Sequence, residues 1–337
     1  MSKRTLDSFF KPTTPKRPKL EQNEQIPPTI SESSIPTNKP PSQHPSYPIP
    51  IPQLPSHIEA GLQHSTPFKQ PTQITNQPHL DLLHYTPYLP RPTANELFKF
   101  LRHSLPFYRV RYTARRGPIS TEINTPRWTT VFGVDETSLF KDDKLVDSKT
   151  GSPISPTKYQ CTPRPIPECL EQLRREVEAH AQDGTGEKGY NFCLVNYYGS
   201  GEDSIAFHSD DERFLGARPN IASLSLGGER DFLMKHKPVL VAPGATGPGS
   251  PKSSTATVPV GRQIKMSLGS GDMVVMRGET QANWLHSIPK RKGSQGRINI
   301  TFRRAVVPAG TNNYYHYNVG SGKMYRWDDV SREMVEK

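Results

Sequence analysis

The spacing of apolar residues predicts two helices ahead of a later β region. Thr93 and Glu96 form the T-x-x-E pattern of a capping box, and the apolar residues behind it share one helical face: Leu97, Phe98, Leu101 and Leu105. A second helix is predicted from about Pro167, because proline is favoured in a first helical turn and the apolar residues that follow turn inward: Leu170, Leu173 and Val177.

Beyond the second helix, the period of the pattern changes to two residues. Six short segments are rich in β-branched and aromatic residues: YNFCLVNYY, NIASLSL, RDFLMKH, QIKMSL, DMVVM and RINITFRR. Short strands preceded by helices predict a mostly β protein with supporting helices, in which a β-sandwich or jelly roll has helices against one sheet.

Proline marks a boundary near the start of this pattern. Residues 1–92 hold 19 of the 35 prolines, and the prolines deprive this stretch of amide donors and apolar periodicity. We therefore expect residues 1–78 to be a disordered, partly polyproline-II tail and residues 79–330 to form one folded domain. Two stretches that interrupt the strand pattern, residues 139–158 and 241–261, are predicted to be surface insertions.

Charge suggests the kind of partner. The net charge is +11, from 43 basic and 32 acidic residues, and basic side chains cluster at residues 109–116, 235–237, 290–292 and 303–304. Clustered cations attract polyanions, which makes nucleic acid the first candidate partner, with solubility as the alternative. The three cysteines fit neither a disulfide framework nor a zinc site, and no apolar run approaches the ~18 residues that cross a bilayer. We expect a soluble, intracellular monomer with no membrane segment.

The tail carries two short signals. Leu6, Phe9 and Phe10 can share one face of a helical turn, and residues 3–10 resemble the peptide by which replication and repair proteins dock on the sliding clamp PCNA. Lys3 stands where that peptide prefers glutamine. Residues 11–20 contain a short basic run that is typical of nuclear import, which predicts a nuclear protein.

Strand parity gathers polar residues on one face of two predicted strands, because residues two apart share a face. Asn196 and Tyr198 share a face of the first strand. In RINITFRR the polar residues share one face and the apolar residues share the other, and the polar face consists of Arg297, Asn299, Thr301 and Arg303. Two inward arginines are costly unless they meet an anion.

Two histidines and a carboxylate complete a candidate site. His208 and Asp210 are two residues apart, and His286 precedes the last strand. Such a set forms the facial triad of Fe(II), which leaves coordination positions open for a chelating cosubstrate and dioxygen. A dicarboxylate such as 2-oxoglutarate would explain the inward arginines, because guanidinium binds carboxylate bidentately. A zinc site or a structural polar cluster is the alternative, and neither predicts the arginine pair.

These elements together resemble the AlkB family of Fe(II)/2-oxoglutarate dioxygenases. The family pattern is N-x-Y, then H-x-D, a distant H and R-x-N-x-T-F-R, and residues 190–236 and 283–304 contain every part of it. HSDDERF, IASLSLGGERDFLMKHK and LHSIPKRK are most similar to the nuclear branch that repairs double-stranded DNA. The resemblance implies a double-stranded β-helix (jelly roll, cupin-like) core and oxidative demethylation of N1-methyladenine and N3-methylcytosine in DNA.

The resemblance also implies residue roles. One end of 2-oxoglutarate would lie near Arg303, and its far carboxylate would meet Arg297, Asn196 and Tyr198. Asp211 and Glu212 would favour a cationic methylated base beside the metal, with an exposed acidic turn as the alternative for Glu212. Tyr159 would stack on that base, with Cys161 at a position that is often aromatic in the family. Contacts to DNA are expected from basic side chains: Arg127, Lys237, Lys290, Arg291 and Lys292.

A further basic segment and three other functions stay open at this stage. Arg109, Arg111, Arg115 and Arg116 are expected on a loop that grips DNA, with Tyr108 or Tyr112 as a possible wedge. An RNA demethylase with the same chemistry is the nearest alternative function. A non-catalytic adaptor bound to the clamp and a hydroxylase of proteins or small molecules are the others.

Overall fold

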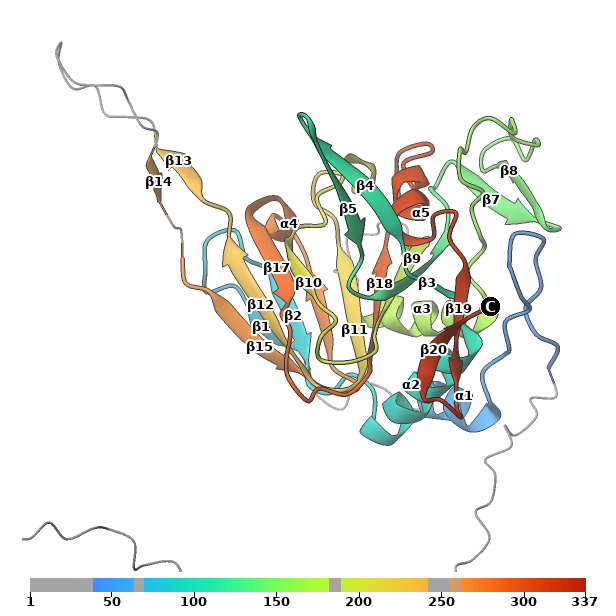
Figure 1. The fold of residues 1–337 in the computed structure, drawn as a ribbon, viewed down its shortest axis with the longest axis horizontal. Coiled ribbons are helices and arrows are strands. Elements are labelled where there is room, and N and C mark those ends of the chain that lie inside the picture. The colour runs from blue at the N-terminus through green and yellow to red at the C-terminus, as the bar shows by residue number, and fades with distance from the viewer. Residues whose placement is uncertain (1–38, 64–69, 182–188, 242–255, 259–260) are drawn as a thin grey trace, which may run out of the picture. The chain divides into compact units, whose positions relative to one another are not determined.

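Two β-sheets build the core of the protein (Figure 1). The computed structural model describes residues 39–63, 70–181, 189–241, 256–258 and 261–337. The larger sheet has the spatial strand order β1 (Thr72–Ile74), β2 (Leu82–Tyr85), β16 (Met273–Met276), β11 (Ile221–Gly227), β18 (Arg297–Arg303), β9 (Phe192–Tyr198), β6 (Trp128–Gly133), β3 (Phe107–Tyr108), β19 (Met324–Asp328) and β20 (Glu333–Glu336). The smaller sheet has the order β10 (Ile205–His208), β17 (Trp284–Ile288), β12 (Arg230–His236) and β15 (Ile264–Leu268).

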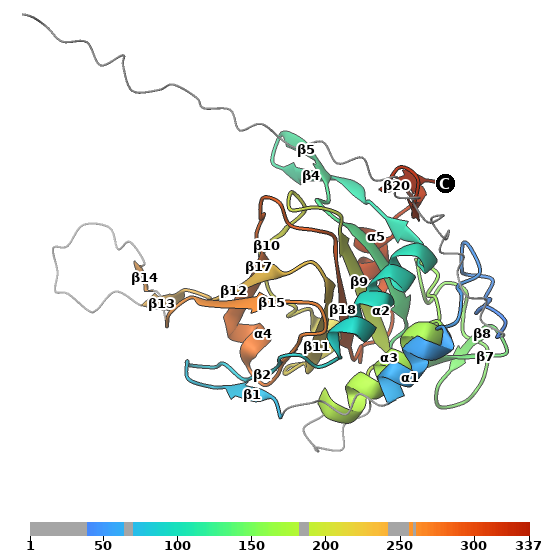
Figure 2. The same cartoon turned by 90° about the horizontal axis from the view of Figure 1, so that it is seen from below.

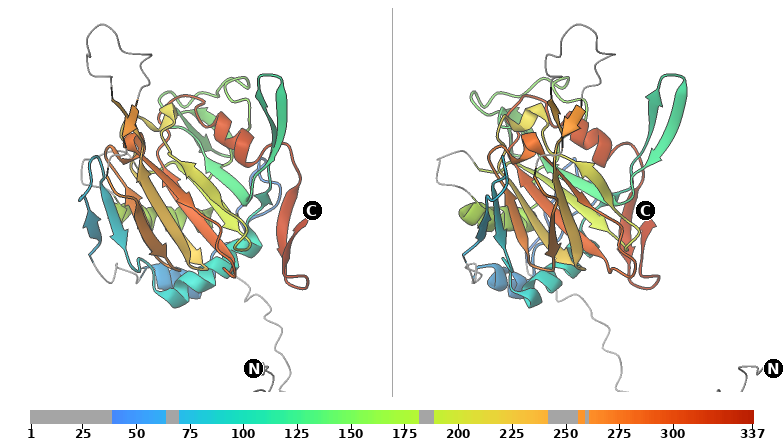
Figure 3. Two further views of the ribbon diagram at one scale, coloured as in Figure 1. Left: turned by 60° about the vertical axis from the view of Figure 1, so that its left-hand side comes forward. Right: turned by 90° about the vertical axis from the view of Figure 1, so that its left-hand side faces the viewer.

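Within the described residues, three two-stranded hairpins accompany the sheets. They are β4 (Arg111–Arg116) with β5 (Ile119–Asn124), β7 (Ser138–Lys141) with β8 (Lys144–Asp147), and β13 (Val239–Val241) with β14 (Ala256–Val258). The arginine-rich stretch that was expected to be a loop is therefore strand β4, and its hairpin projects beyond the sheets (Figure 3). The expected insertion at 139–158 contains the ordered hairpin β7–β8, whereas most of the one at 241–261 lies outside the described residues.

Three helices cover one face of the larger sheet (Figure 2): α1 (Ser56–Gln63), α2 (Arg91–Ser104) and α3 (Glu168–Ala181). Shorter segments are the 3-10 turn η1 (Arg213–Leu215), α4 (Thr280–Asn283) and α5 (Asn312–Asn318). The mostly β architecture with supporting helices agrees with the prediction. No helix among the described residues has both the length and the apolar character needed to cross a membrane.

Alternation along the central strands separates two buried layers. On β9, Cys193, Val195 and Tyr197 belong to the cluster that packs under the helices, whereas Phe192 and Leu194 belong to the cluster between the sheets. The same rule puts the apolar residues of β18 on the helix side and its polar residues on the other side. The period of two therefore predicted correctly which face of each strand carries the polar site.

The capping box predicted for α2 was wrong. The helix begins at Arg91, with Pro90 as its N-cap and no side-chain capping hydrogen bond, so Thr93 already lies inside the first turn. Proline fits here because its φ suits a helix start and the first helical N–H groups lack partners within the helix. The predicted inner face is otherwise correct, since Leu97 and Leu101 are fully buried.

The predicted disordered tail was too long. Residues 39–63 pack against the domain, and four of their apolar side chains lie in the core under the sheet: Ile51, Leu54, Ile58 and Leu62. β1 adds a further strand beside β2. Proline excludes regular hydrogen bonding but allows extended backbone, so a proline-rich segment can still bury apolar residues at intervals. The clamp-like peptide at 3–10 and the basic run at 11–20 lie outside the described residues.

Candidate metal centre

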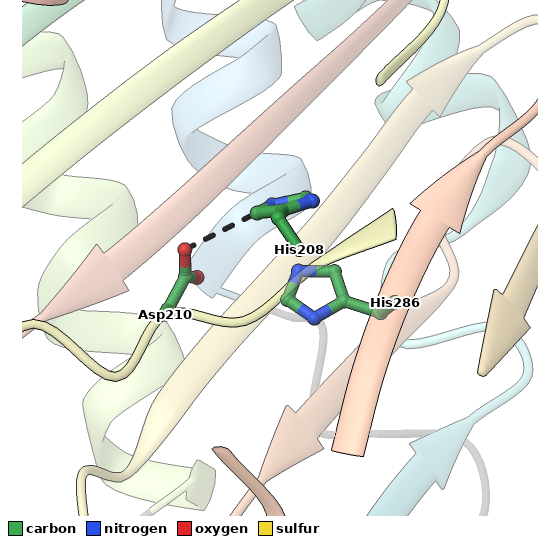
Figure 4. A group of neighbouring side chains, drawn as sticks. All are labelled: His208, Asp210 and His286. Carbon is green, nitrogen blue, oxygen red and sulfur yellow. Dashed lines mark ion pairs between the residues drawn. The ribbon is translucent and has the colours of Figure 1, made fainter. Parts of the chain in front are cut away.

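The two histidines and the aspartate of the predicted triad converge. β10 and β17 are antiparallel neighbours, and their register sets His208 opposite His286. The two ring centroids lie 4.2 Å apart, and Asp210 Oδ1 lies 3.9 Å from His208 Nε2 (Figure 4). One ligand atom from each of the three side chains lies within 4.8 Å of the others, which is the arrangement a metal ion needs.

Asp210 is an ionised carboxylate although only 3% of the residue is exposed. Arg303 Nη2 donates to Asp210 Oδ2 over 2.7 Å, and the backbone N–H of Asp210 donates to Gln281 Oε1 over 2.9 Å. Burial by itself raises the pKa of Asp210, but the charge and the hydrogen bond of Arg303, with the histidines adding to them only when protonated, outweigh burial and leave this pKa below its usual value. The carboxylate is therefore charged and its orientation is fixed, as a metal ligand requires.

His286 is a neutral imidazole. Burial, and next to it the neighbouring His208, lower the pKa of His286 to about 3. The ring stacks on Phe232 with centroids 5.5 Å apart, and its Nδ1 is buried without a hydrogen-bond partner in the described structure. A neutral ring with an unused nitrogen can bind a metal.

The polar face of β18 forms the neighbouring wall, and its two arginines keep unused donors. Arg297 is 1% exposed, and its Nη2 donates to Ser225 Oγ over 2.9 Å. Arg297 Nε and Nη1 and Arg303 Nε are buried and have no hydrogen-bond partner among the described residues. Burial lowers the pKa of Arg297 to about 10, so the guanidinium stays charged near neutral pH. Buried guanidinium nitrogens without a partner are stabilised when an anion accepts their hydrogen bonds.

The other predicted cosubstrate residues line the same cavity but differ in their contacts. Asn299 donates to Ser223 Oγ and Leu224 O, and Thr301 donates to Leu194 O, so these two side chains fasten β18 to its neighbours. On β9, Asn196 Oδ1 accepts a hydrogen bond from Arg127 Nε over 2.8 Å, and the Tyr198 ring lies 5.4 Å from the Arg297 guanidinium.

A cavity of about 580 Å³ joins the triad to this wall. It is lined by all three triad residues and by both arginines of β18. A histidine–aspartate–histidine set suits Fe(II), and two charged guanidinium groups with free donors suit a dicarboxylate beside it. The residues present therefore fit Fe(II) and 2-oxoglutarate better than a closed zinc site, which would leave the guanidinium donors unused.

The two acidic residues that follow Asp210 lie in different environments. Glu212 lines the cavity, its Oε1 accepts a hydrogen bond from Tyr314 over 3.0 Å, and its Oε2 is buried without a hydrogen-bond partner in the described structure. Burial, and then Asp210, raise the pKa of Glu212. Asp211 is exposed instead and pairs with Lys237 over 2.6 Å. Neighbouring side chains of this segment thus face different sides, and the role of Asp211 beside the metal stays a prediction.

Tyr159 does not line the cavity, which corrects its predicted stacking role. Its hydroxyl donates to Asp135 Oδ2 over 2.6 Å and lies 3.0 Å from Ser138 Oγ, within hydrogen-bond distance. Asp135 is fully buried, and a buried carboxylate needs donors, so it holds the phenol away from the cavity. Cys161 is half-buried and packs beside the core between the sheets.

Aromatic side chains reach the cavity from elements that the sequence did not assign to the site. Tyr112 comes from β4, and Tyr314 and Tyr317 come from α5. Tyr112 had been named only as a possible wedge. The tyrosines of α5 follow the last recognised motif, and their only signal in the sequence was the aromatic density of NNYYHYN.

The basic residues predicted to contact DNA occupy three environments. Lys290, Arg291 and Lys292 are exposed on the loop between β17 and β18. The backbone N–H of Arg291 donates to Gly201 O, and a Cβ on Gly201 would lie 1.8 Å from Arg291 O, so only glycine lets the two segments meet. Arg127 lies in the cavity wall instead, and Lys237 pairs with Asp211.

Comparison with known proteins identifies the class. Residues 81–303 match the 2OG-Fe(II) oxygenase superfamily. This match covers more than half of the chain and includes all three triad residues. The protein belongs to the 2OG-Fe(II) oxygenase superfamily, whose members use Fe(II) and 2-oxoglutarate.

Individual relatives narrow the class to the AlkB family. The chain is 30% identical over 224 residues to DNA oxidative demethylase ALKBH2 of Homo sapiens, which covers 66% of this chain and 73% of that protein. It is 43% identical over 117 residues to DNA oxidative demethylase ALKBH2 of Arabidopsis thaliana, covering 34% of this chain and 37% of that protein. It is 32% identical over 177 residues to alpha-ketoglutarate-dependent dioxygenase alkB homolog 3 of Rattus norvegicus, covering 52% of this chain and 55% of that protein. The last two matches span less than two thirds of those relatives. Together with the superfamily match, these relatives confirm the predicted resemblance to the AlkB family.

Proposed function

We propose that the protein is a DNA repair dioxygenase that removes methyl groups from N1-methyladenine and N3-methylcytosine. The reaction would release formaldehyde and the restored base while 2-oxoglutarate and O2 become succinate and CO2. The observation that carries this proposal is Glu212, a carboxylate with a buried, unpaired oxygen in the wall of the cavity that holds the triad. The printed names of the ALKBH2 relatives, DNA oxidative demethylase, support the same choice.

Glu212 suits these two lesions because both carry a positive charge. A methyl group on N1 of adenine or N3 of cytosine makes the ring cationic and blocks its pairing edge. Blocked pairing lowers the cost of flipping the base out of the helix, and a carboxylate of low solvent exposure attracts a cation more strongly than one in water. Tyr314, which donates to Glu212, fixes the orientation of this carboxylate.

The residues of the chain would position and polarise the reactants. Bound Fe(II), together with 2-oxoglutarate and O2, supplies the oxidising power that hydroxylates the N-methyl carbon. Arg297 would bind a carboxylate of 2-oxoglutarate through its unpaired nitrogens, and Arg303 holds the ligand Asp210 in its ionised form. The bond between the hydroxymethyl carbon and the ring nitrogen then breaks, the nitrogen keeps the electron pair, and the hydroxyl proton passes to water as formaldehyde leaves.

Basic groups on two elements support a nucleic acid as the substrate. The loop of Lys290, Arg291 and Lys292 and the hairpin β4–β5, with Arg111 and Arg115, expose cations, and Ile119 on the hairpin is 65% exposed. Such contacts to phosphates position a duplex without reading its sequence. Duplex DNA is therefore the favoured substrate, and single-stranded DNA or RNA is the alternative.

Two further proposals concern the N-terminal tail. Leu6, Phe9 and Phe10 would dock on PCNA, and the basic run at 11–20 would direct the protein to the nucleus. Both would bring the enzyme to replicating DNA.

The substrate is tested by comparing turnover on four oligonucleotides. A single N1-methyladenine is placed in duplex DNA, single-stranded DNA, duplex RNA and single-stranded RNA, and formaldehyde and succinate are measured together. We expect the highest kcat/KM on DNA, with about one formaldehyde per succinate. A preference for RNA would refute the DNA assignment. Succinate release that no methylated nucleic acid stimulates would favour a hydroxylase of proteins or small molecules, and no release at all would favour the adaptor.

A further inference from the structure

The last part of the chain lies beyond the family match but belongs to the domain. The match ends at residue 303, and the chain continues through α5, β19 and β20. β19 pairs with β3 and thereby extends the larger sheet, and Thr129 Oγ1 on β6 donates to Asn318 O at the end of α5 over 2.6 Å. α5 is thus fixed to the sheet, and its residues Asn313, Tyr314, Tyr317 and Asn318 form part of the cavity wall.

Two tyrosines from different elements meet where the cavity opens. Tyr317 of α5 and Tyr112 of β4 both line the cavity, and their ring centroids lie 5.3 Å apart at 69°. Tyr317 is 46% exposed and Tyr112 is half-buried, so both rings stand at the rim. The view in Figure 1 shows α5 beside the hairpin that carries Tyr112.

The other aromatic rings of the cavity already have partners. Phe232 stacks on the metal-ligand candidate His286, Tyr198 lies against Arg297, and Tyr314 is bonded to Glu212. Phe207 lies under Lys235, whose Nζ is 4.1 Å from the ring centroid. Tyr159, the ring expected to stack on the substrate, is held by Asp135 outside the cavity. Tyr112 and Tyr317 contact each other, and Tyr317 also contacts His316, but these rings stand at the rim and Tyr317 is 46% exposed, so an entering molecule can reach them.

We infer that Tyr112 and Tyr317 form an aromatic clamp at the rim, in which the methylated base stacks on the exposed Tyr317 ring as it enters the cavity and Tyr112, in edge-to-face contact with that ring, holds it in place. This inference rests on the proposed function and adds a binding residue, Tyr317, from the C-terminal segment. A base that leaves the helix loses its stacking neighbours, and an aromatic side chain can replace them. A cationic base gains further, because the faces of the two phenol rings attract positive charge.

The test compares Tyr317→Ala and Tyr112→Ala with Tyr317→Phe and the wild type. Tyr325→Ala is the matched control, because Tyr325 lies in the same C-terminal segment, is half-buried on β19 and does not line the cavity. Each iron-loaded full-length variant is assayed on duplex DNA with one N1-methyladenine. Equilibrium binding to the methylated duplex and to the same duplex with adenine is measured in parallel by fluorescence anisotropy.

We expect Tyr317→Ala to lower kcat/KM by about 5-fold to 140-fold, mainly through a higher KM, which corresponds to ~1–3 kcal/mol of stacking at 1.4 kcal/mol per tenfold. The preference for the methylated duplex in the binding assay should fall as well. Tyr317→Phe should keep most of both, and Tyr325→Ala should match the wild type. Tyr112→Ala tests the other ring of the clamp, which comes from a different element, β4.

Two results would overturn the inference. If the wild type demethylates DNA but Tyr317→Ala and Tyr112→Ala retain its KM and its binding preference, the clamp does not exist and the proposed function still stands. If Tyr317→Ala lowers kcat and melting temperature without changing the binding preference, the role of Tyr317 is structural. A wild type that acts on no methylated nucleic acid would instead refute the proposed function, and the clamp with it.

Discussion

Replacing Arg297 with lysine tests directly whether the polar face of β18 binds 2-oxoglutarate. The substitution keeps a positive charge at a position that is 1% exposed, but it removes the planar pair of donors that a carboxylate can bind bidentately. Nη2 of Arg297 is already used by Ser225, and Nε and Nη1 are the buried donors without a partner. Lysine can replace the charge but not both of these hydrogen bonds.

The expected magnitude follows from the bond that is lost. One hydrogen bond to a charged group contributes roughly 1.5–3 kcal/mol, which corresponds to a rise of about 10-fold to 140-fold in the KM for 2-oxoglutarate. The assay is succinate release at varied 2-oxoglutarate with saturating methylated DNA. The KM for DNA should change little, because Arg297 is buried and contacts Ser225 and Tyr198, whereas the basic loop expected to contact DNA is exposed.

Arg230→Lys is the matched control. Arg230 is also fully buried, but it does not line the cavity and donates to backbone carbonyls of Ser200, Asp203 and Pro289. Its replacement should lower the melting temperature and leave the KM for 2-oxoglutarate near the wild-type value. An Arg297→Lys enzyme with an unchanged KM for 2-oxoglutarate would refute the assignment of this wall.

Three further predictions concern stability, the basic loop and the tail. Leu62→Ala should lower the free energy of unfolding, measured in urea, by ~2–5 kcal/mol, because Leu62 is buried in the core under the sheet. Val330→Ala, at an exposed position, is its control, and equal stabilities of the two variants would contradict the packing of α1. Changing Lys290, Arg291 and Lys292 together to alanine should weaken duplex binding and reduce the salt dependence of log K by about 3, and an unchanged slope would remove this loop from the DNA interface. Deleting residues 1–11 should abolish binding to PCNA while activity on short oligonucleotides persists, and retained binding would disprove the docking peptide.

The sequence pattern alone predicted the side-chain directions of the site residues that lie on regular strands. The period of two in β9 and β18 put Asn196, Tyr198 and both arginines on one face, and the structure has them there. The spacing of His208 and Asp210 predicted a shared site with His286, which the antiparallel register of β10 and β17 brings about. In these cases the side-chain direction follows from the backbone alone.

Contacts between segments distant in the sequence set the positions of the side chains that the sequence pattern could not place. Tyr159 is diverted by Asp135, and Asp211 turns to Lys237 while its neighbour Glu212 faces the cavity. α5 reaches the cavity because its carbonyl at Asn318 is bonded to β6, a long-range contact that no spacing in the sequence encodes. The proline-rich segment before residue 64 was misjudged because composition measures the average content of a stretch, whereas burial depended on a few apolar positions such as Leu54.

The most direct measurement is formaldehyde release from an N1-methyladenine oligonucleotide, with Fe(II) and 2-oxoglutarate added or withheld. We expect release that requires both additions, equals the succinate formed, and disappears in His208→Ala and Asp210→Ala. The fold of both variants is checked by circular dichroism. Formaldehyde release that persists without iron, or in either folded variant, would contradict an iron-dependent demethylase built on this triad.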